Sequence, residues 1–185
     1  MTEISDETRT LPSALERFVL QWGEMGGPWG VNRSVSQIHA LLYLSERPLS
    51  AEEIADTLWL ARSNVSNSLK ELLAWNLIRR VPVKGDRREH FEAETDVWEI
   101  AVRIAARRKE REIDPAVAAL RTCVAEAAND RAVHPVAAAR LREMLAFVEM
   151  LDCFYGQMLT VPRTKLEALI RLGSRIAGLL PGRRK

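Results

Sequence analysis

The segment that most constrains the fold is residues 49–92, where the apolar spacing of helices gives way to the alternation of strands. Ser50 can cap a helix, and Glu53 three residues later completes a capping box. A second helix is predicted from about residue 63 to 76, with its apolar side chains on one side. Asn76 can adopt the left-handed conformation that ends a helix. The first half of the segment is therefore a pair of short helices.

The second half of this segment has the signature of a β-hairpin. Residues 78–83 alternate, Lys84-Gly85-Asp86 supplies a tight turn, and residues 87–92 can return as the second strand. Pro82 cannot donate to a ladder and requires an unpaired or bulged position. Two helices followed by a hairpin form the winged helix-turn-helix arrangement, whose second helix fits the major groove of DNA.

The turn between the two helices departs from the common pattern. It contains no glycine and places Trp59 where the chain must reverse. Trp59 must therefore either avoid a positive φ or accept strain. Ala61, just before the second helix, also lacks the hydroxyl often found at a helix cap.

Helices are predicted on both sides of this segment. Their approximate ranges are 12–24, 34–45, from 95 or 96 onward, from 114 onward, 135–160 and 163–180. The last two carry apolar residues at alternating steps of three and four, which makes a seam for another helix. In the longer one the seam consists of Leu141, Met144, Val148, Leu151, Tyr155 and Met158.

The expected fold is mainly α with a small β-wing, in three parts. Residues 1–33 form an N-terminal helix and linker for dimerisation or support, and residues 34–95 form the winged helix-turn-helix. Residues 96–185 form a C-terminal helical region for dimerisation and effector binding.

The predicted second helix carries an unusual set of side chains. Val65 and Leu69 point inward at 100° per residue, while short polar residues lie outward or on the flanks. Serine and asparagine are modest helix formers, so their clustering favours hydrogen bonds to bases and phosphates. A solvated helix face beside a cap is the alternative. The candidate contacts are Arg62, Ser63, Asn64, Ser66, Asn67 and Lys70.

Charge is concentrated in the same region. Residues 62–91 carry a net charge of +4, whereas the whole chain carries +2. A local basic patch on a nearly neutral protein indicates one surface that faces a polyanion. The candidate wing contacts are Lys84, Asp86, Arg87 and Arg88.

Three runs of sequence resemble the MarR superfamily of transcriptional regulators: residues 48–55, 62–72 and 84–91. The segment Trp29-Gly30-Val31-Asn32-Arg33-Ser34 is most similar to the GbsR-like branch, and the resemblance extends over about residues 22–115.

The resemblance implies a homodimeric repressor or activator that binds double-stranded DNA at a pseudo-palindromic operator. Asp86 and Arg88 match the Asp-x-Arg pair of such wings, in which the arginine enters or borders the minor groove and the aspartate orients it. GbsR-like relatives include sensors of choline or related osmolytes, so the resemblance is compatible with a small-molecule effector. An aromatic cage for a quaternary ammonium group is less expected than core packing of the tryptophans.

Other classes of function find little support. No apolar run is long enough to span a bilayer, and the polar N-terminus lacks a signal-peptide pattern, so a cytoplasmic location is expected. The three histidines lack zinc spacing, catalytic motifs are missing, and no metal, cofactor or enzymatic activity is expected. Cys123 and Cys153 are expected to be buried, inert thiols. A winged-helix module for protein–protein interaction and a ligand-blind architectural DNA binder stay open as alternatives.

Overall fold

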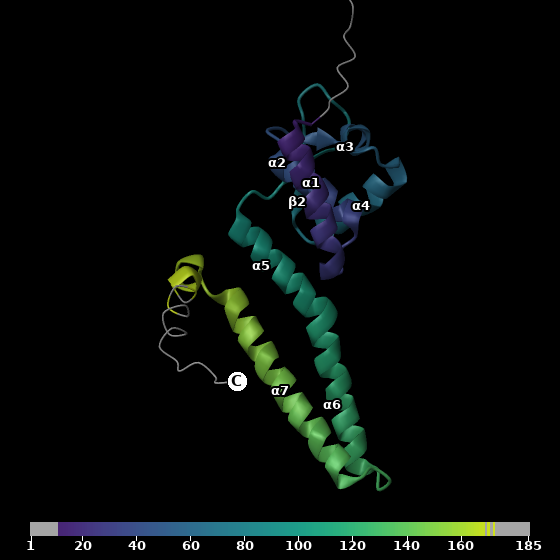
Figure 1. Ribbon diagram of the computed structural model, residues 1–185, viewed down its shortest axis with the longest axis vertical. Helices are drawn as coiled ribbons and strands as arrows, with labels where there is room; N and C mark the ends of the chain where they lie inside the picture. Colours follow the sequence, from purple (N-terminus) through teal and green to yellow (C-terminus); the bar gives the residue numbers. More distant parts are fainter. Residues whose placement is uncertain (1–10, 169, 171, 173–185) are drawn as a thin grey trace, which may run out of the picture. The chain divides into compact units, whose positions relative to one another are not determined.

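The computed structural model describes residues 11–168, 170 and 172, and it divides into two compact units (Figure 1). The first unit ends at Arg103 and the second begins at Ile104, so the boundary lies inside helix α5 (Val97–Arg108). The sequence predicts a boundary somewhat earlier, between residues 95 and 96. A mainly helical chain with one small antiparallel sheet confirms the predicted fold class.

The first unit is a winged helix preceded by two further helices. The two preceding helices are α1 (Ser13–Gly26) and α2 (Arg33–Leu44), joined through the short 3-10 helix η1 (Gly27–Trp29). The winged helix itself consists of β1 (Leu49–Ser50), α3 (Ala51–Leu58), α4 (Arg62–Ala74), β2 (Ile78–Val81) and β3 (His90–Ala93), after which α5 begins.

The predicted helix ends are confirmed in atomic detail. At the start of α3, the Glu53 amide donates to Ser50 Oγ over 3.3 Å, and the Ser50 amide donates to Glu53 Oε2 over 2.9 Å. Asn76 adopts a φ of 55° just beyond α4. Asp96 Oδ1 accepts a hydrogen bond from the Trp98 amide over 2.8 Å at the start of α5.

The turn between α3 and α4 accepts strain. Trp59 has φ 53° and ψ 42°, which is the left-handed region, and it ends α3 with its amide bonded to the Ala55 carbonyl. For a residue with a Cβ this conformation costs about 1–2 kcal/mol. The short reversal between the two helices is thus made without glycine.

The sheet is shorter than the sequence predicts. Its order is β1-β3-β2 with both pairs antiparallel, and Ile78 faces Ala93 while Val81 faces His90. The ladder stops before Pro82 because proline has no amide proton to donate. Residues 82–89 instead form a wing loop, in which Gly85 takes a φ of 86°.

The core of the first unit lies between α2, the two helices that follow, and the sheet. Val35, Ile38, Leu41 and Leu42 of α2 are buried, as are Val65 and Leu69, which the sequence predicts to point inward from α4. Its most buried apolar members are Val19, Val35, Ile38, Leu41, Ile54, Val65, Leu69, Leu72, Leu77 and Phe91. The helix proposed to face DNA is therefore fixed on its inner side by close packing.

Helices α1 and α2 approach each other closely at two glycines. A Cβ at Gly26 would lie 2.1 Å from Ser36 Oγ, and one at Gly23 would lie 2.6 Å from Gln37 Cγ. Ser36 and Gln37 are themselves buried on α2, so they have little room to move. The contact between the two helices therefore depends on the absence of a side chain at Gly23 and at Gly26.

We expect Gly26→Ala to lower the free energy of unfolding by about 1–3 kcal/mol, because it overpacks this contact. Its φ of −60° suits alanine, so backbone strain does not contribute. The control is Gln21→Ala at an exposed position of α1, which should change stability by less than about 0.5 kcal/mol. Chemical denaturation measures both, and equal stability of the two variants would refute the close packing.

His39 is a buried titratable group on α2. Its side chain is 4% exposed, and its Nε2 atom has no hydrogen-bond partner among the described residues. Burial lowers the pKa of His39 from 6.5 to about 4, because the charged ring would lose its hydration. The folded protein therefore holds His39 neutral at pH values where an unfolded chain protonates it.

This difference predicts acid sensitivity with a defined window. As pH falls from about 6.5 to 4 the unfolded chain gains a proton that the folded state refuses, so stability should fall by up to about 3 kcal/mol. His39→Leu should lack this part of the decline, because leucine does not titrate. The part that comes from carboxylates should remain, since both proteins share it. NMR titration of the His39 ring checks the same point directly, and a midpoint near 6.5 would contradict it.

The second unit is built from the remainder of α5 and a long helical hairpin. A π-helical turn, η2 (Lys109–Ile113), leads without a break into α6 (Asp114–Asn129), and residues 130–134 connect it to α7 (Pro135–Thr160). The predicted start of a helix near residue 114 is confirmed, although the π-helical turn joins this helix to α5 without a gap. Pro115 lacks the amide that an α-helix needs there, and the chain absorbs one extra residue instead of stopping.

Lys109 links the π-helical turn to both neighbouring helices. Its Nζ atom lies 2.7 Å from Asp152 Oδ1 on α7, and it also pairs with Asp114 at the start of α6. The hydrogen bond that Lys109 donates to Asp114, followed by the one it donates to Asp152, raises the pKa of Lys109. The Tyr155 hydroxyl donates to the Ala105 carbonyl over 3.2 Å, which adds a second link across the unit.

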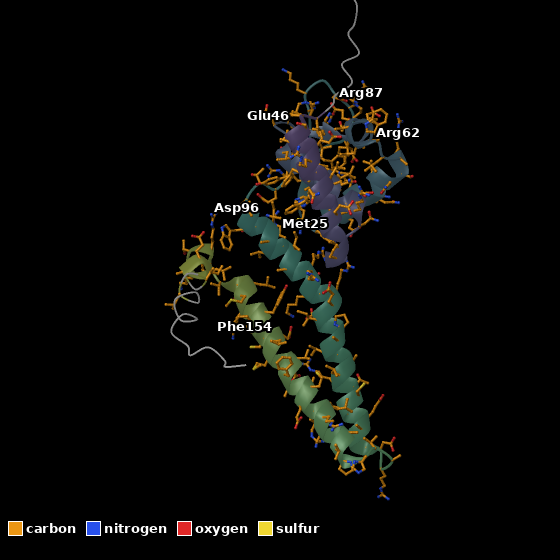
Figure 2. The ribbon with its side chains drawn as sticks, in the orientation of Figure 1. Met25, Glu46, Arg62, Arg87, Asp96 and Phe154 are labelled. Carbon is orange, nitrogen blue, oxygen red and sulfur yellow. The ribbon has the colours of Figure 1, made fainter. Side chains whose placement is uncertain are left out.

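Helix α7 has the predicted bounds but two apolar faces in place of one. Leu141, Val148 and Tyr155 of the predicted seam are partly buried, whereas Met144 and Leu151 are exposed. Phe147 and Phe154 are also exposed, and Phe154 is labelled in Figure 2. Met144, Phe147, Leu151 and Phe154 follow one another at steps of three and four. Residues 163–168 are helical as predicted, and the rest of the predicted helix to residue 180 lies outside the described residues apart from 170 and 172.

Both cysteines are exposed, so the expectation of buried thiols was wrong. Cys123 lies on α6 and Cys153 on α7, and neither turns toward the contact between these helices. The apolar neighbours in sequence misled the prediction because adjacent residues on a helix point in different directions.

Candidate nucleic-acid interface

Helix α4 separates its side chains into a buried and an exposed face. Val65, Leu69 and Leu72 are buried. The exposed members of the predicted set are Arg62, Ser63, Ser66, Asn67 and Lys70, which we call the α4 polar row. No acidic residue occurs between residues 62 and 70, so a polyanion would meet no like charge there.

Asn64 differs from the rest of its predicted group. It is partly buried, and its Nδ2 donates to Ser34 Oγ over 2.8 Å. Ser68 Oγ in turn donates to Asn64 Oδ1 over 3.4 Å. The Asn64 amide is therefore used within the protein, where it links α4 to the first turn of α2.

The N-terminus of α4 has no side-chain cap. Ala61 occupies the cap position with an extended backbone, and its carbonyl accepts from the Val65 amide over 3.1 Å. The remaining first-turn amides carry the partial positive charge of a helix start. Such amides suit a phosphate oxygen, and Arg62 stands at the same point of the helix.

The wing is organised around one carboxylate. Arg88 Nε lies 3.0 Å from both Asp86 oxygens, its terminal nitrogen also contacts Oδ2, and its amide donates to Oδ1 over 2.9 Å. These hydrogen bonds from Arg88 hold the pKa of Asp86 well below its usual range. The Arg88 side chain stays half-exposed, so its guanidinium is oriented but accessible.

His90 supports this pair from inside the sheet and was missed in the sequence. It is 3% exposed, with Nε2 3.4 Å from Asp86 Oδ2 and Nδ1 3.0 Å from the Arg88 carbonyl. The Asp86 carboxylate thus lies between Arg88 and His90, and the wing loop is joined to β3. The only sequence signal was a histidine four residues after the aspartate, which is weak by itself.

The other basic residues of the region fall into two groups. Arg79 and Arg80 lie on β2 beside Glu92 and Glu89, which compensate their charge locally. Lys84 and Arg87 are exposed in the wing loop. Arg62 and Arg87 lie toward the same end of the first unit, opposite Met25 at the end of α1 (Figure 2).

Residues 29–89 match the family model described as the MarR family. The match covers the winged helix as far as the wing loop. It begins at the end of η1 and stops inside the wing loop, so it contains both the α4 polar row and the Asp86–Arg88 pair. The matched segment is about a third of the chain, which leaves α1 and the second unit outside the match.

Two curated proteins of Bacillus subtilis (strain 168) are similar to this chain. YvaV, which carries the name of an HTH-type transcriptional regulator, is 21% identical over 94 residues, covering 51% of this chain and 53% of YvaV. The HTH-type transcriptional repressor OpcR is 19% identical over 93 residues, covering 50% of each chain. The chain therefore spans about half the length of these relatives.

A solved structure described as a transcriptional regulator shares the fold. It superimposes with a TM-score of 0.61 at 20% identity, covering 79% of this chain and 95% of the other. This likeness extends beyond the matched segment and confirms the winged-helix architecture. Within the described part of the chain, no helix is long and apolar enough to cross a membrane, and no group of three or more His, Cys, Asp or Glu could hold a metal.

Proposed function

We propose that this protein is a sequence-specific, DNA-binding transcriptional regulator of the MarR superfamily, and not an enzyme. The observation that carries the proposal is the juxtaposition in one winged helix of an exposed, acid-free polar row on α4 and a wing arginine oriented by Asp86. The family match and the curated relatives support it.

The α4 polar row reads the major groove in this proposal. Ser63, Ser66 and Asn67 are short enough to let the helix approach base edges, with which they form hydrogen bonds. Arg62 and Lys70 contact phosphates on either side of the groove. Asn64 acts indirectly, since its bond to Ser34 fixes the angle at which α4 leaves the core.

The wing contacts the neighbouring minor groove. Lys84 and Arg87 neutralise phosphates, while Arg88 enters or borders the groove, where a narrow width concentrates negative potential. Because Asp86 already orients the guanidinium, less conformational entropy is lost on binding than for a free arginine.

We infer that the protein acts as a homodimer through its terminal helices. The exposed apolar residues Met144, Phe147, Leu151 and Phe154 support this, since their spacing on α7 suits another helix. A two-fold dimer would place its recognition helices ~34 Å apart and favour a pseudo-palindromic operator.

The finer assignments belong to the same proposal. OpcR is named a repressor, which supports a repressor role here. The segment Trp29 to Ser34 favours the GbsR-like branch, and with it an osmolyte such as choline as the effector. Operator binding measured with and without choline tests the effector, and an unchanged affinity would favour a ligand-blind DNA binder.

We expect Asn67→Ala to weaken binding to the selected operator by about 1–3 kcal/mol and binding to random DNA hardly at all, because the amide pairs with a base edge. Asn129→Ala, on α6 outside the proposed interface, is the control and should bind both DNAs normally. Fluorescence anisotropy measures all four affinities. Equal losses on operator and random DNA would reduce Asn67 to a positioning contact.

We expect Arg88→Ala to weaken binding and to reduce the slope of log affinity against log salt by about 1, because one phosphate-region contact is lost. Arg79→Ala removes an arginine already paired with Glu92 and should leave the slope unchanged. If Arg88→Ala and Arg79→Ala show the same slope of log affinity against log salt, Arg88 does not contact DNA. If the unsubstituted protein binds no genomic fragment even at low salt, the protein–protein module becomes the better proposal.

A further inference from the structure

Trp59 is placed where folding gains little from it. Its side chain is 85% exposed, so the indole contributes almost nothing to the core. Its backbone also lies in the left-handed region at φ 53° and ψ 42°, where glycine would be free of strain. Both facts make tryptophan a poor choice for the stability of this turn.

Among the described residues, the other non-glycine residue with a positive φ provides a contrast. Asn76 adopts a φ of 55° just after α4, but asparagine tolerates the left-handed region better than other residues with a Cβ. An ordinary helix-ending residue therefore occupies one end of α4, and a strained, exposed aromatic one precedes the other end. Strain retained at an exposed position indicates a use outside folding.

The position of Trp59 identifies what it would touch. It lies three residues before Arg62, which limits the distance between their Cα atoms to about 11 Å. Trp59 ends α3 with an exposed indole, and two residues later Ala61 leaves the first turn of α4, which suits phosphate, without a side-chain cap. If the α4 polar row enters the major groove, Trp59 reaches the sugar-phosphate backbone at the edge of that groove.

We propose that Trp59 is a further DNA contact of this protein, which packs its ring against the deoxyribose backbone while its Nε1–H donates to a phosphate oxygen. This inference rests on the proposed function. Indole supplies a flat apolar surface and one donor, which match the apolar sugar and the anionic phosphate of a backbone. Since every nucleotide offers both groups, the contact increases affinity without distinguishing sequences.

The test is Trp59→Gly in the full chain, measured for stability and for DNA affinity. Glycine removes the backbone strain, so the melting temperature should stay the same or rise. Affinity should fall about tenfold, by the same factor on operator and random DNA. Trp59→Phe keeps a ring and loses the donor, so its DNA affinity should lie between that of the unsubstituted protein and that of Trp59→Gly.

Asn76→Gly is the matched control, because it places glycine at the positive φ beyond the far end of α4 and should leave affinity unchanged. The unsubstituted protein should also show a change of tryptophan emission on binding DNA that Trp59→Phe largely lacks. Normal affinity of Trp59→Gly would overturn the inference and leave the proposed function intact. Failure of the unsubstituted protein to bind DNA would overturn both.

Discussion

The attachment of α4 to α2 is the interaction on which the rest of the first unit depends. Val65, Leu69 and Leu72 fix the inner side of α4 in the core, and the hydrogen bond from Asn64 to Ser34 fixes its rotation at the N-terminal end. A helix that reads a groove must present its outer side chains at one angle, and close packing supplies that angle better than exposed charges can. The polar row is a consequence of this attachment.

The wing must also hold its side chains in one orientation, and it does so with few apolar contacts. An exposed ion pair in water is weak, since solvent screens the charges and both side chains lose freedom. Asp86 overcomes this weakness by accepting from the Arg88 side chain and amide while lying close to the buried His90 ring. A short loop thereby gains a defined shape at its tip, where few other residues could contribute one.

Local signals in the sequence were sufficient for most of the fold. The capping box at Ser50, the left-handed Asn76 and the position of Pro82 outside the ladder each depend on neighbouring residues alone, and each prediction is confirmed. The bond from Asn64 to Ser34 joins residues 30 positions apart, so no local pattern could reveal it. The π-helical turn that joins α5 to α6 was missed, and so were the exposed cysteines, whose apolar sequence neighbours point in other directions on the helix.

The π-helical turn at Lys109–Ile113 has a consequence for how this chain could vary. One extra residue in a helical turn rotates everything beyond it by about 100° relative to an unbroken α-helix. The residues of α5 just before the turn are therefore kept in phase with α6 and α7 by a single inserted position, at which Lys109 pairs with Asp114 and Asp152. Removing one residue here would rotate α6 and α7 relative to Ala105, whose carbonyl accepts from Tyr155, so length in this stretch is constrained more tightly than amino-acid identity.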